Sequence, residues 1–372
     1  YTPEDSRVYF RTHAEFYENT RLKPYHSERD FLKDIDWLDV LIEEARKRGM
    51  KTGAELSHTI FPAEPLEKEF PDTLQRNIYG EIISNRLMCM NNSDARNYTI
   101  GLFADVVANH DIDFVQTCLI LFNTGQIWDP KVSWYFATDK AARERRGELH
   151  RLVGLAQSGG CFCKACQEKA QAEGLDVERI LARIRELADL ASGHTLETAH
   201  MAALLNASNT SASDLLMEYP ELFEWMQFRA RTITGLFKEI SEKIKSIKPQ
   251  IDFRYNTYMP HPELAGLHLP SIVPYIDSLR ESDYSEQVGT LEALELKRQL
   301  LYKERRVLGY DKPLIAALGV RPMATPEILK ASIAICGETG CDGLSLGHYD
   351  GANMERLRAI KEGMAEAEIE SI

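Results

Sequence analysis

Residues 313–347 read PLIAALGVRPMATPEILKASIAICGETGCDGLSLG, with a short apolar segment on either side of a helical pattern. The two segments, 313–320 and 343–347, have the length of buried strands. Between them, Thr325 is a residue type that caps helices, and Pro326 suits the first helical position. Parallel strands are joined by a right-handed crossover helix, so this stretch predicts a βαβ unit.

The same alternation extends along the rest of the chain. Seven predicted strands alternate with helical patterns, which is typical of a parallel sheet covered by helices. We therefore expect an α/β fold, and within that class a (β/α)8 TIM barrel. An open, doubly wound sheet is the alternative, but no glycine-rich phosphate turn follows any predicted strand. The five other predicted strands are 51–60, 84–89, 112–121, 251–258 and 274–283.

A closed barrel has eight strands, so one strand is missing from this count. Residues 7–12 could form a stunted first strand, but they carry two arginines and little apolar surface. We therefore expect the first strand to lie upstream of Tyr1. A capping pattern at residues 27–30 predicts the first helix, whose apolar positions recur at helical spacing until the chain reaches Gly49.

Residues 122–250 separate the predicted fourth and fifth strands, which is far more than one crossover helix needs. We expect a large helical insertion there, on the C-terminal face of the barrel. The predicted organisation is a first part of the barrel over 1–121, the insertion with its cysteine cluster over 122–250, and a second part of the barrel over 251–372.

The composition is that of a globular protein and excludes several kinds of partner. The 372 residues are 44% hydrophobic, and 44 basic against 57 acidic residues give a net charge of −13. A net acidic chain without a basic run is a poor partner for nucleic acid. Long apolar runs are absent, so we expect no membrane-spanning helix and no membrane partner. No secretion signal is visible at Tyr1, but a targeting segment upstream would not be seen, so the compartment is left open with the cytoplasm favoured.

Three of the seven cysteines are crowded into Cys161-Phe-Cys163-Lys-Ala-Cys166, which follows two glycines. Thiolates at this spacing can converge on one Zn²⁺ ion, and a fourth ligand would complete the tetrahedron. Four thiolates leave no position for water, so such a zinc ion would be structural. The alternative is a set of free or partly oxidised thiols in an exposed loop. The candidates for the fourth ligand are Cys89, Cys118 and His150.

The cysteine motif resembles the zinc loop of the glycoside hydrolase family 42 β-galactosidases and of related barrels. In that family, an upstream cysteine followed closely by Asn and Ser supplies the fourth ligand, which corresponds here to residues 89–93, CMNNS. Residues 41–51 are also similar to the first helix and second strand of many hydrolase barrels. The resemblance implies a TIM barrel, hydrolysis of a glycosidic bond, and a structural zinc ion on Cys89, Cys161, Cys163 and Cys166.

The family's catalytic residues have no counterpart in this sequence. In family 42 the fourth strand ends in Asn-Glu, and this Glu is the general acid/base. Residues 113–119 here read DFVQTCL, with no carboxylate at the end of the strand. The seventh strand, 314–320, likewise offers no Glu as a nucleophile. The two catalytic roles therefore cannot be transferred from the resemblance.

Other polar side chains lie where barrel strands end, and such side chains converge on one mouth. Alternation predicts that Glu55 points inward from the second strand, and that Arg254 and Asn256 do so from the fifth. A structural ion pair between Glu55 and Arg254 is the alternative. Two carboxylates on opposite sides of a sugar can act as acid and base. The candidate catalytic residues are Glu55, Glu281, Asp283 and Asp350.

The neighbouring polar residues are candidates for binding a substrate. Histidines at strand ends could serve in acid/base chemistry or bind a divalent ion. Guanidinium and amide groups could hold sugar hydroxyls. The candidate substrate-binding residues are His58, Arg86, Gln116, Arg254, Asn256, Arg280 and His348.

We therefore expect a carbohydrate-active enzyme that hydrolyses a glycosidic bond with carboxylates at the barrel rim. One alternative is a metal-dependent sugar isomerase or lyase, which needs a second metal at His348, Asp350 or Glu281. The other is a barrel that binds carbohydrate without catalysis. In each case the partner is a small carbohydrate, and assembly into a homo-oligomer is left open.

Overall fold

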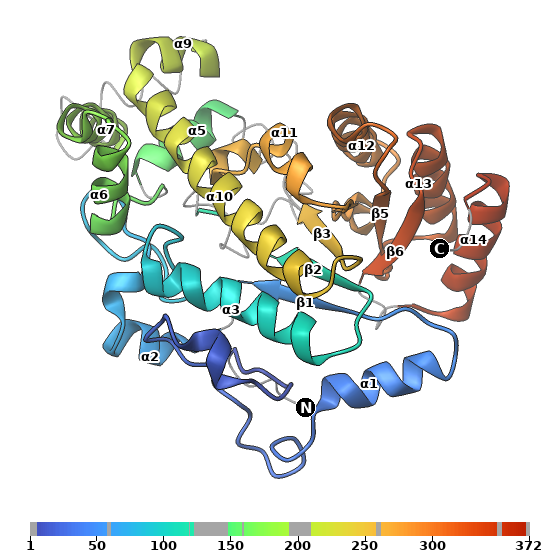
Figure 1. Cartoon of the computed structure of the whole chain (residues 1–372). Helices are drawn as coiled ribbons and strands as arrows, with labels where there is room; N and C mark the ends of the chain where they lie inside the picture. The colour runs from blue at the N-terminus through green and yellow to red at the C-terminus, as the bar shows by residue number, and fades with distance from the viewer. Residues whose placement is uncertain are drawn as a thin grey trace. The chain divides into compact units, whose positions relative to one another are not determined.

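The computed structural model describes residues 6–57, 61–118, 120–122, 148–157, 160–192, 210–257, 262–347 and 352–369. Within these residues the chain forms two compact units (Figure 1). The first unit consists of the residues up to Ile251 together with Glu263–His268. The second consists of Asp252–Pro262 and the residues from Leu269 onward.

Two parallel strands form the sheet of the first unit. β1 (Gly53–Ser57) lies beside β2 (Phe114–Cys118). Glu55 on β1 is directly opposite Gln116 on β2. Gly53 allows the two strands to approach, because a Cβ atom there would lie 2.3 Å from the ring of its β2 neighbour. The sheet therefore brings one acidic and one amide side chain together.

Long helices make up most of the first unit. α3 (Ser93–Asn109) precedes β2, and α10 (Pro220–Ile247) packs against α3 (Figure 1). Pro220 occupies the first turn of α10, where its missing N–H is not needed. The other helices of this unit are α1 (Trp37–Arg46), α2 (Ala63–Lys68), α5 (Glu148–Gln157), α6 (Lys164–Ala172), α7 (Val177–Ser192) and α9 (Ala212–Glu218), with 3-10 turns η1 (Ala14–Tyr17) and η2 (Pro71–Thr73).

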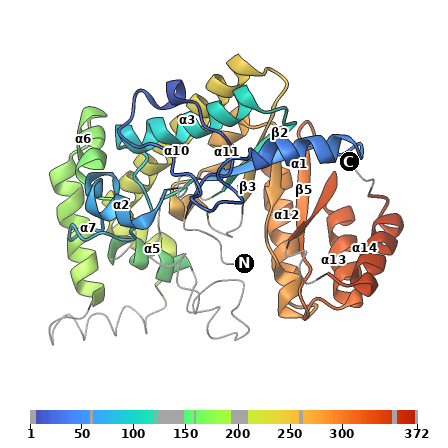
Figure 2. The ribbon, with the colours of Figure 1, turned by 90° about the horizontal axis from the view of Figure 1, so that it is seen from below.

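The second unit contains four parallel strands in chain order. Each strand pairs with the next one, and helices connect the last three. Figure 2 shows α13 and α14 side by side in this unit, where they pack against each other. Its elements are β3 (Asp252–Thr257), α11 (Leu269–Ile272), β4 (Ser278–Glu281), α12 (Leu294–Leu308), β5 (Leu314–Gly319), α13 (Pro326–Glu338), β6 (Gly343–Gly347) and α14 (Met354–Glu366), with 3-10 turns η5 (Val273–Tyr275) and η6 (Ser285–Val288). After its first residue, the 3-10 turn η4 (Pro262–Ala265) belongs to the first unit.

The βαβ unit predicted from residues 313–347 is present as β5, α13 and β6. All six residues of β5 are buried, as expected of a central parallel strand. The hydroxyl oxygen of Thr325 accepts the backbone N–H of Ile328, and Pro326 is the first residue of α13. Local capping chemistry was therefore sufficient to predict where this helix begins.

The strand predicted over residues 84–89 is wrong. This segment pairs locally in an antiparallel loop, with bridges between Leu74 and Met88 and between Arg76 and Ile82. The side chain of Gln75 also donates to the Met88 carbonyl at 3.1 Å. Because the loop satisfies its own backbone groups, β1 pairs directly with β2 instead.

The first helix begins later than predicted. It starts at Trp37, where the Asp36 side chain accepts the backbone N–H groups of Leu38 and Asp39. Phe31 is 58% exposed and so makes no core contact that would extend the helix toward the pattern at residues 27–30.

Six strands are present in the part of the chain that the structure describes, two in the first unit and four in the second. Residues 7–12 contribute only an isolated bridge between Val8 and His26. A first strand upstream of Tyr1 stays a prediction, as do the three parts proposed from the sequence. The elements described between β2 and β3 are helices, where the insertion was predicted. None of the described helices is long and apolar enough to cross a membrane.

Candidate functional site

Four buried cysteines meet in the first unit. Cys89, Cys161, Cys163 and Cys166 place their sulfur atoms within 4.8 Å of one another. The Sγ atoms of Cys89 and Cys166 are 3.3 Å apart, so they are not bonded as a disulfide. A tetrahedral zinc site with bonds of about 2.3 Å has sulfur–sulfur edges of about 3.8 Å. The cluster therefore has the composition and compactness to hold a structural metal such as zinc.

Three local features position these sulfurs. Gly160 has a φ of +62°, which turns the chain into the motif. Cys163 is the N-cap of α6, so Cys166 lies in the first helical turn. Cys89 lies before α3 and is fully buried. Of the three predicted fourth ligands, Cys89 is the one that joins the cluster; the side chain of His150 lies outside the described residues.

Asn91 links the cluster to the surrounding helices. Its backbone N–H points to Cys89 Sγ at 3.4 Å, and its Nδ2 atom lies 3.3 Å from Cys166 Sγ. The hydroxyl of Thr232 on α10 in turn donates to Asn91 Oδ1 at 3.1 Å. Hydrogen bonds of this kind orient metal ligands and stabilise negative sulfur. Asn91 was quoted in the sequence motif, but its role depends on this folded geometry.

A fully buried arginine lies near the four sulfurs. Arg229 donates from Nη1 to the Leu264 carbonyl at 3.1 Å, and its guanidinium lies 4.9 Å from the centre of the Phe122 ring. Burial lowers the pKa of Arg229 to about 10, while the nearby cysteines act in the opposite direction. A cation here offsets the negative charge that four thiolates and a divalent ion carry together. Sequence patterns gave no indication of this partner.

The first predicted catalytic acid pairs with a predicted binding residue. Gln116 donates from Nε2 to Glu55 Oε2 at 2.5 Å across the strands β1 and β2. Gln116 is buried, whereas Glu55 is exposed. Glu55 is thus an accessible carboxylate whose orientation is held by a buried amide.

A second polar group surrounds Arg280 on β4. Its Nε donates to Ser345 Oγ at 2.9 Å, and its Nη1 donates to Asn256 Oδ1 at 2.8 Å and to Ser282 Oγ. Its Nη2 donates to the hydroxyl of Tyr284 at 3.1 Å. Arg280 is 9% exposed. Arg280 and Asn256, both predicted as substrate-binding residues, are therefore in direct contact. The sequence analysis did not identify the two serines and the tyrosine as part of this group.

Glu281 and Asp283 lie in a different environment from Arg280. Glu281 is opposite Thr257, whose hydroxyl donates to Glu304 on α12, so this face of the strands lies against the helix. Burial raises the pKa of Glu281 well above its ordinary value and raises that of Asp283 to about 6. The nearby charge of Lys297 acts in the opposite direction and lowers both pKa values. Both carboxyls are buried, and their catalytic role stays a prediction.

The buried carboxyl of Glu304 should make the stability of the second unit depend on pH. Burial raises its pKa from 4.5 to about 8, and its Oε2 atom has no hydrogen-bond partner in the described part of the chain. The folded unit therefore holds a proton that the unfolded chain releases above pH 4.5. The free energy of unfolding should fall as the pH rises from about 5 to about 8.

Glu304→Gln should flatten this dependence and stabilise the unit at pH 8. Urea unfolding at three pH values in that range measures the effect. The raised pKa of Asp283 acts in the same direction near pH 6. A stability that rises with pH in the unmodified protein, or an equal slope in the variant, would contradict the assignment.

The remaining predicted residues are partly outside the described structure. His58, His348 and Asp350 lie there, so their roles stay predictions. Arg254 binds Asp252 at 2.6 Å and Ser278 at 3.0 Å. Arg86 is exposed in the antiparallel loop, with Nη1 3.5 Å from Ser6 Oγ, and it is not on a strand. The strand 84–89 on which it was predicted to lie is not formed, and its role in binding a substrate stays a prediction.

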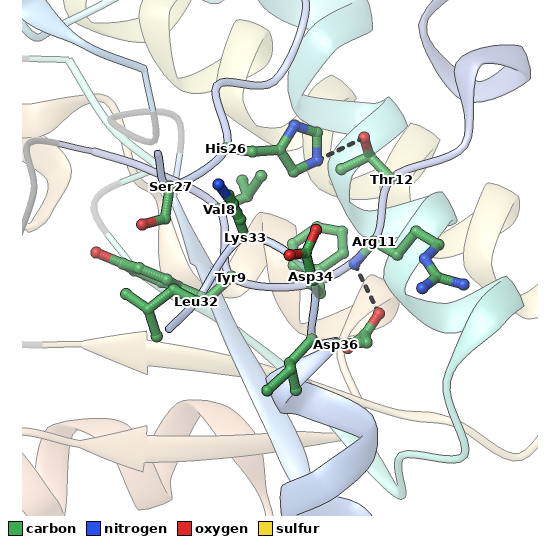
Figure 3. Close-up of a pocket in the computed structure, with 12 residues that line it drawn as sticks. Val8, Tyr9, Arg11, Thr12, His26, Ser27, Leu32, Lys33, Asp34 and Asp36 are labelled. Atoms are coloured by element: carbon green, nitrogen blue, oxygen red, sulfur yellow. Dashed lines mark hydrogen bonds between the residues drawn. The ribbon is translucent and has the colours of Figure 1, made fainter. Parts of the chain in front are cut away.

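A cavity of about 330 Å³ lies beside the N-terminal segment in the first unit (Figure 3). Thr12 and His26 face each other at its wall, with Oγ1 and Nε2 3.0 Å apart. Asp36 also lines it and contacts His110, which precedes β2. The cavity is thus next to the N-terminal end of that strand, whereas barrel enzymes act at the C-terminal ends.

Asp36, Asp39 and His110 also lie close enough together to hold an ion, but their bonds indicate a structural role. Asp36 caps α1 and accepts the backbone N–H of Arg11 at 2.6 Å. Its Oδ2 atom is 3.1 Å from His110 Nε2. The other ring nitrogen of His110 lies 3.2 Å from the Val106 carbonyl. With acceptors facing both ring nitrogens, the histidine tethers α1 to the end of α3.

No protein-family model matches the chain, and a search of curated proteins gave no match. Solved structures do match. The PgaB (BpsB) glycoside hydrolase domain from Bordetella bronchiseptica is 14% identical with a TM-score of 0.57, over 99% of this chain and 84% of that one. A β-galactosidase from the haloarchaeon Halorubrum lacusprofundi is 14% identical with a TM-score of 0.56, over 91% and 52%.

A GH42 β-galactosidase from G. stearothermophilus is 12% identical with a TM-score of 0.51, over 91% of this chain and 49% of that one. The chain thus spans about half the length of these β-galactosidases. At such identities the likeness concerns the fold. The chain has the α/β fold of the barrel domains of glycoside hydrolases, including those of family 42, which confirms the predicted resemblance.

Proposed function

We propose that this protein is a carbohydrate-active enzyme that hydrolyses a glycosidic bond. The observation that carries the proposal is the exposed carboxylate of Glu55, which Gln116 holds in the middle of β1, in a fold shared with glycoside hydrolase domains. In such folds, the carboxyl ends of the strands surround the substrate. A small carbohydrate is the proposed partner, and the proposed (β/α)8 barrel would close with strands outside the six described here.

Glu55 is the carboxylate proposed to act on the glycosidic bond, as an acid or a base at the leaving oxygen. Gln116 positions it by donating to Oε2. The other predicted acids belong to the second unit, where Asp350 stays a proposed candidate and Glu281 and Asp283 are buried near the charge of Lys297. Asn256 and Arg280, which contact each other in that unit, are proposed to bind a sugar.

The metal is proposed to be zinc, held by Cys89, Cys161, Cys163 and Cys166. Four sulfur ligands would close the coordination shell, so the ion would stabilise the fold and take no part in catalysis. The buried cysteines and Asn91 would tie α6 to the segment before α3. The helices that follow β2 are thereby attached to the sheet of the first unit.

Glu55→Gln should lower turnover of a reactive aryl glycoside about 100-fold, because the amide cannot transfer a proton. The measurement is release of nitrophenol from a panel of nitrophenyl glycosides. Glu67→Gln is the matched control, since Glu67 is an exposed residue of α2 and should leave turnover unchanged. Equal activity in Glu55→Gln and the unmodified enzyme would remove Glu55 from the mechanism.

The same panel separates the alternatives. Binding of sugars without turnover by the unmodified protein indicates a non-catalytic carbohydrate-binding barrel. A sugar isomerase needs a second metal besides the four-cysteine site, so elemental analysis would then give more than one metal ion per chain. Sedimentation or gel filtration of the same sample determines whether the chain forms a homo-oligomer.

A further inference from the structure

The second unit buries a cation without a matching anion. Arg280 is 9% exposed, and its described partners are a carboxamide and three hydroxyl groups. No carboxylate in the described part of the chain forms an ion pair with it. A buried charge without a counter-charge costs several kcal/mol. Such residues therefore normally pair with an anion of the protein or with an anionic ligand.

Arg254 shows what a paired arginine looks like in the same sheet. It lies two residues before Asn256 on β3, so the two side chains share a face. The Nη2 atom of Arg254 is 2.6 Å from Asp252 Oδ2. The paired cation is nearer the start of the strands, and the unpaired cation, Arg280, is nearer their carboxyl ends, where barrel enzymes bind substrate.

Two hydrogen-bond donors, one on Arg280 and one on Gln287, have no acceptor among the described residues. Four of the five guanidinium N–H groups of Arg280 have partners, which leaves one hydrogen on Nη2 without an acceptor among the described residues. The Nε2 atom of Gln287 is also buried and has no partner in the same residues. Both observations indicate a missing acceptor with negative charge.

Two glycines make room for this arrangement. Gly319 and Gly347 are paired at the ends of β5 and β6. A Cβ atom on Gly347 would lie 2.4 Å from the ring of Tyr284, and one on Gly319 would lie 2.7 Å from Gln287 Nε2. Tyr284 and Gln287 therefore lie over the strand ends, and Tyr284, which contacts Arg280, is partly exposed. Tyr284 is thus the contact of Arg280 that is partly exposed to solvent.

We propose that Arg280 binds the carboxylate of an acidic sugar, so that the substrate of this protein contains a uronic acid. This inference rests on the proposed carbohydrate-active function and narrows its substrate class. A single carboxylate balances the single positive charge and suits the planar guanidinium. A phosphorylated sugar would share the anionic chemistry, but it would carry up to two negative charges against one cation.

Binding of monosaccharides to the full chain tests the proposal. The probes are D-glucuronate and D-galacturonate, compared with D-glucose and D-galactose and with glucose 6-phosphate, by titration calorimetry or saturation-transfer NMR. The better of the two uronates should bind about tenfold more tightly than its neutral counterpart. In Arg280→Gln, which keeps the polar contacts and removes the charge, this preference should disappear.

Two further variants keep the test decisive. Arg280→Lys retains the charge and should keep part of the preference, which covers the case in which Arg280→Gln does not fold. Arg306→Gln removes an exposed cation of α12 in the same unit and should leave the preference intact. Equal binding of uronates and neutral sugars, tighter binding of the phosphate, or a preference that survives in Arg280→Gln would overturn the inference but not the proposed function. Failure of all sugars to bind would overturn both.

Discussion

Replacing Cys166 with serine should remove the metal and destabilise the first unit. Serine is a poor ligand for zinc, and three remaining thiolates cannot complete the tetrahedron. The buried sulfurs would then face one another without a cation between them. We expect zinc content to fall from one ion per chain to near zero, and the free energy of unfolding to fall by about 3 kcal/mol or more.

Elemental analysis of purified protein and urea unfolding measure the two effects. Cys341→Ser is the matched control, because Cys341 is partly buried in the second unit, 3.6 Å from the hydroxyl of Thr339. That variant should retain both metal and stability. Prolonged treatment with a chelator should reproduce the effect of Cys166→Ser in the unmodified protein. Retention of one zinc ion by Cys166→Ser would show that the cluster is not the metal site.

Replacing Lys297 with methionine should destabilise the second unit by about 3–5 kcal/mol, the cost of leaving a buried carboxylate without its partner. Lys297 and Glu286 are both fully buried, and their Nζ and Oε1 atoms are 2.5 Å apart. Burial lowers the pKa of Lys297, but the charge of Glu286 outweighs it and keeps the ammonium charged. The lysine also donates to the Ala317 carbonyl on β5.

Glu286 connects several elements, which is why its charge matters. It accepts from the backbone N–H of Gly319 at 3.1 Å and from the hydroxyl of Ser332 on α13. In the double variant Lys297→Met with Glu286→Gln, the carboxylate that lost its partner is removed as well, so part of the stability should return. The return is incomplete, because buried Asp283 still lacks the nearby cation. The measurements are urea unfolding by circular dichroism and hydrogen exchange of α12 and α13. A double variant less stable than Lys297→Met alone would contradict this account.

The features of this protein that depend on residues close together in the sequence could be predicted. Capping by Thr325 and Pro326, and the apolar segments on either side, were sufficient for β5, α13 and β6. The three crowded cysteines predicted a metal cluster, because cysteines so close in sequence can bring their sulfur atoms together around one ion. Cys89 required the resemblance to a known family, since nothing local connects it to residues 72 or more positions later.

Other predictions failed or stayed incomplete because they depend on distant partners. The segment at 84–89 had strand-like composition, but Gln75 and its neighbours pair with it locally. Glu281 and Arg280 are adjacent at the end of one strand, and their composition could not distinguish the face against α12 from the opposite face. The partners of Arg280 come from β3, β6 and the segment after β4.

By itself, the sequence determined the α/β class, the start of α13 and the presence of a thiolate cluster, because each depends on residues a few positions apart. Only the tertiary structure decided which carboxylates are accessible, which cation is left without an anion, and which strands pair. Those properties depend on desolvation and on contacts between residues far apart in the chain. Glu55 and Glu281 are both glutamates near the ends of parallel strands, yet one is exposed beside Gln116 and the other is buried near Lys297.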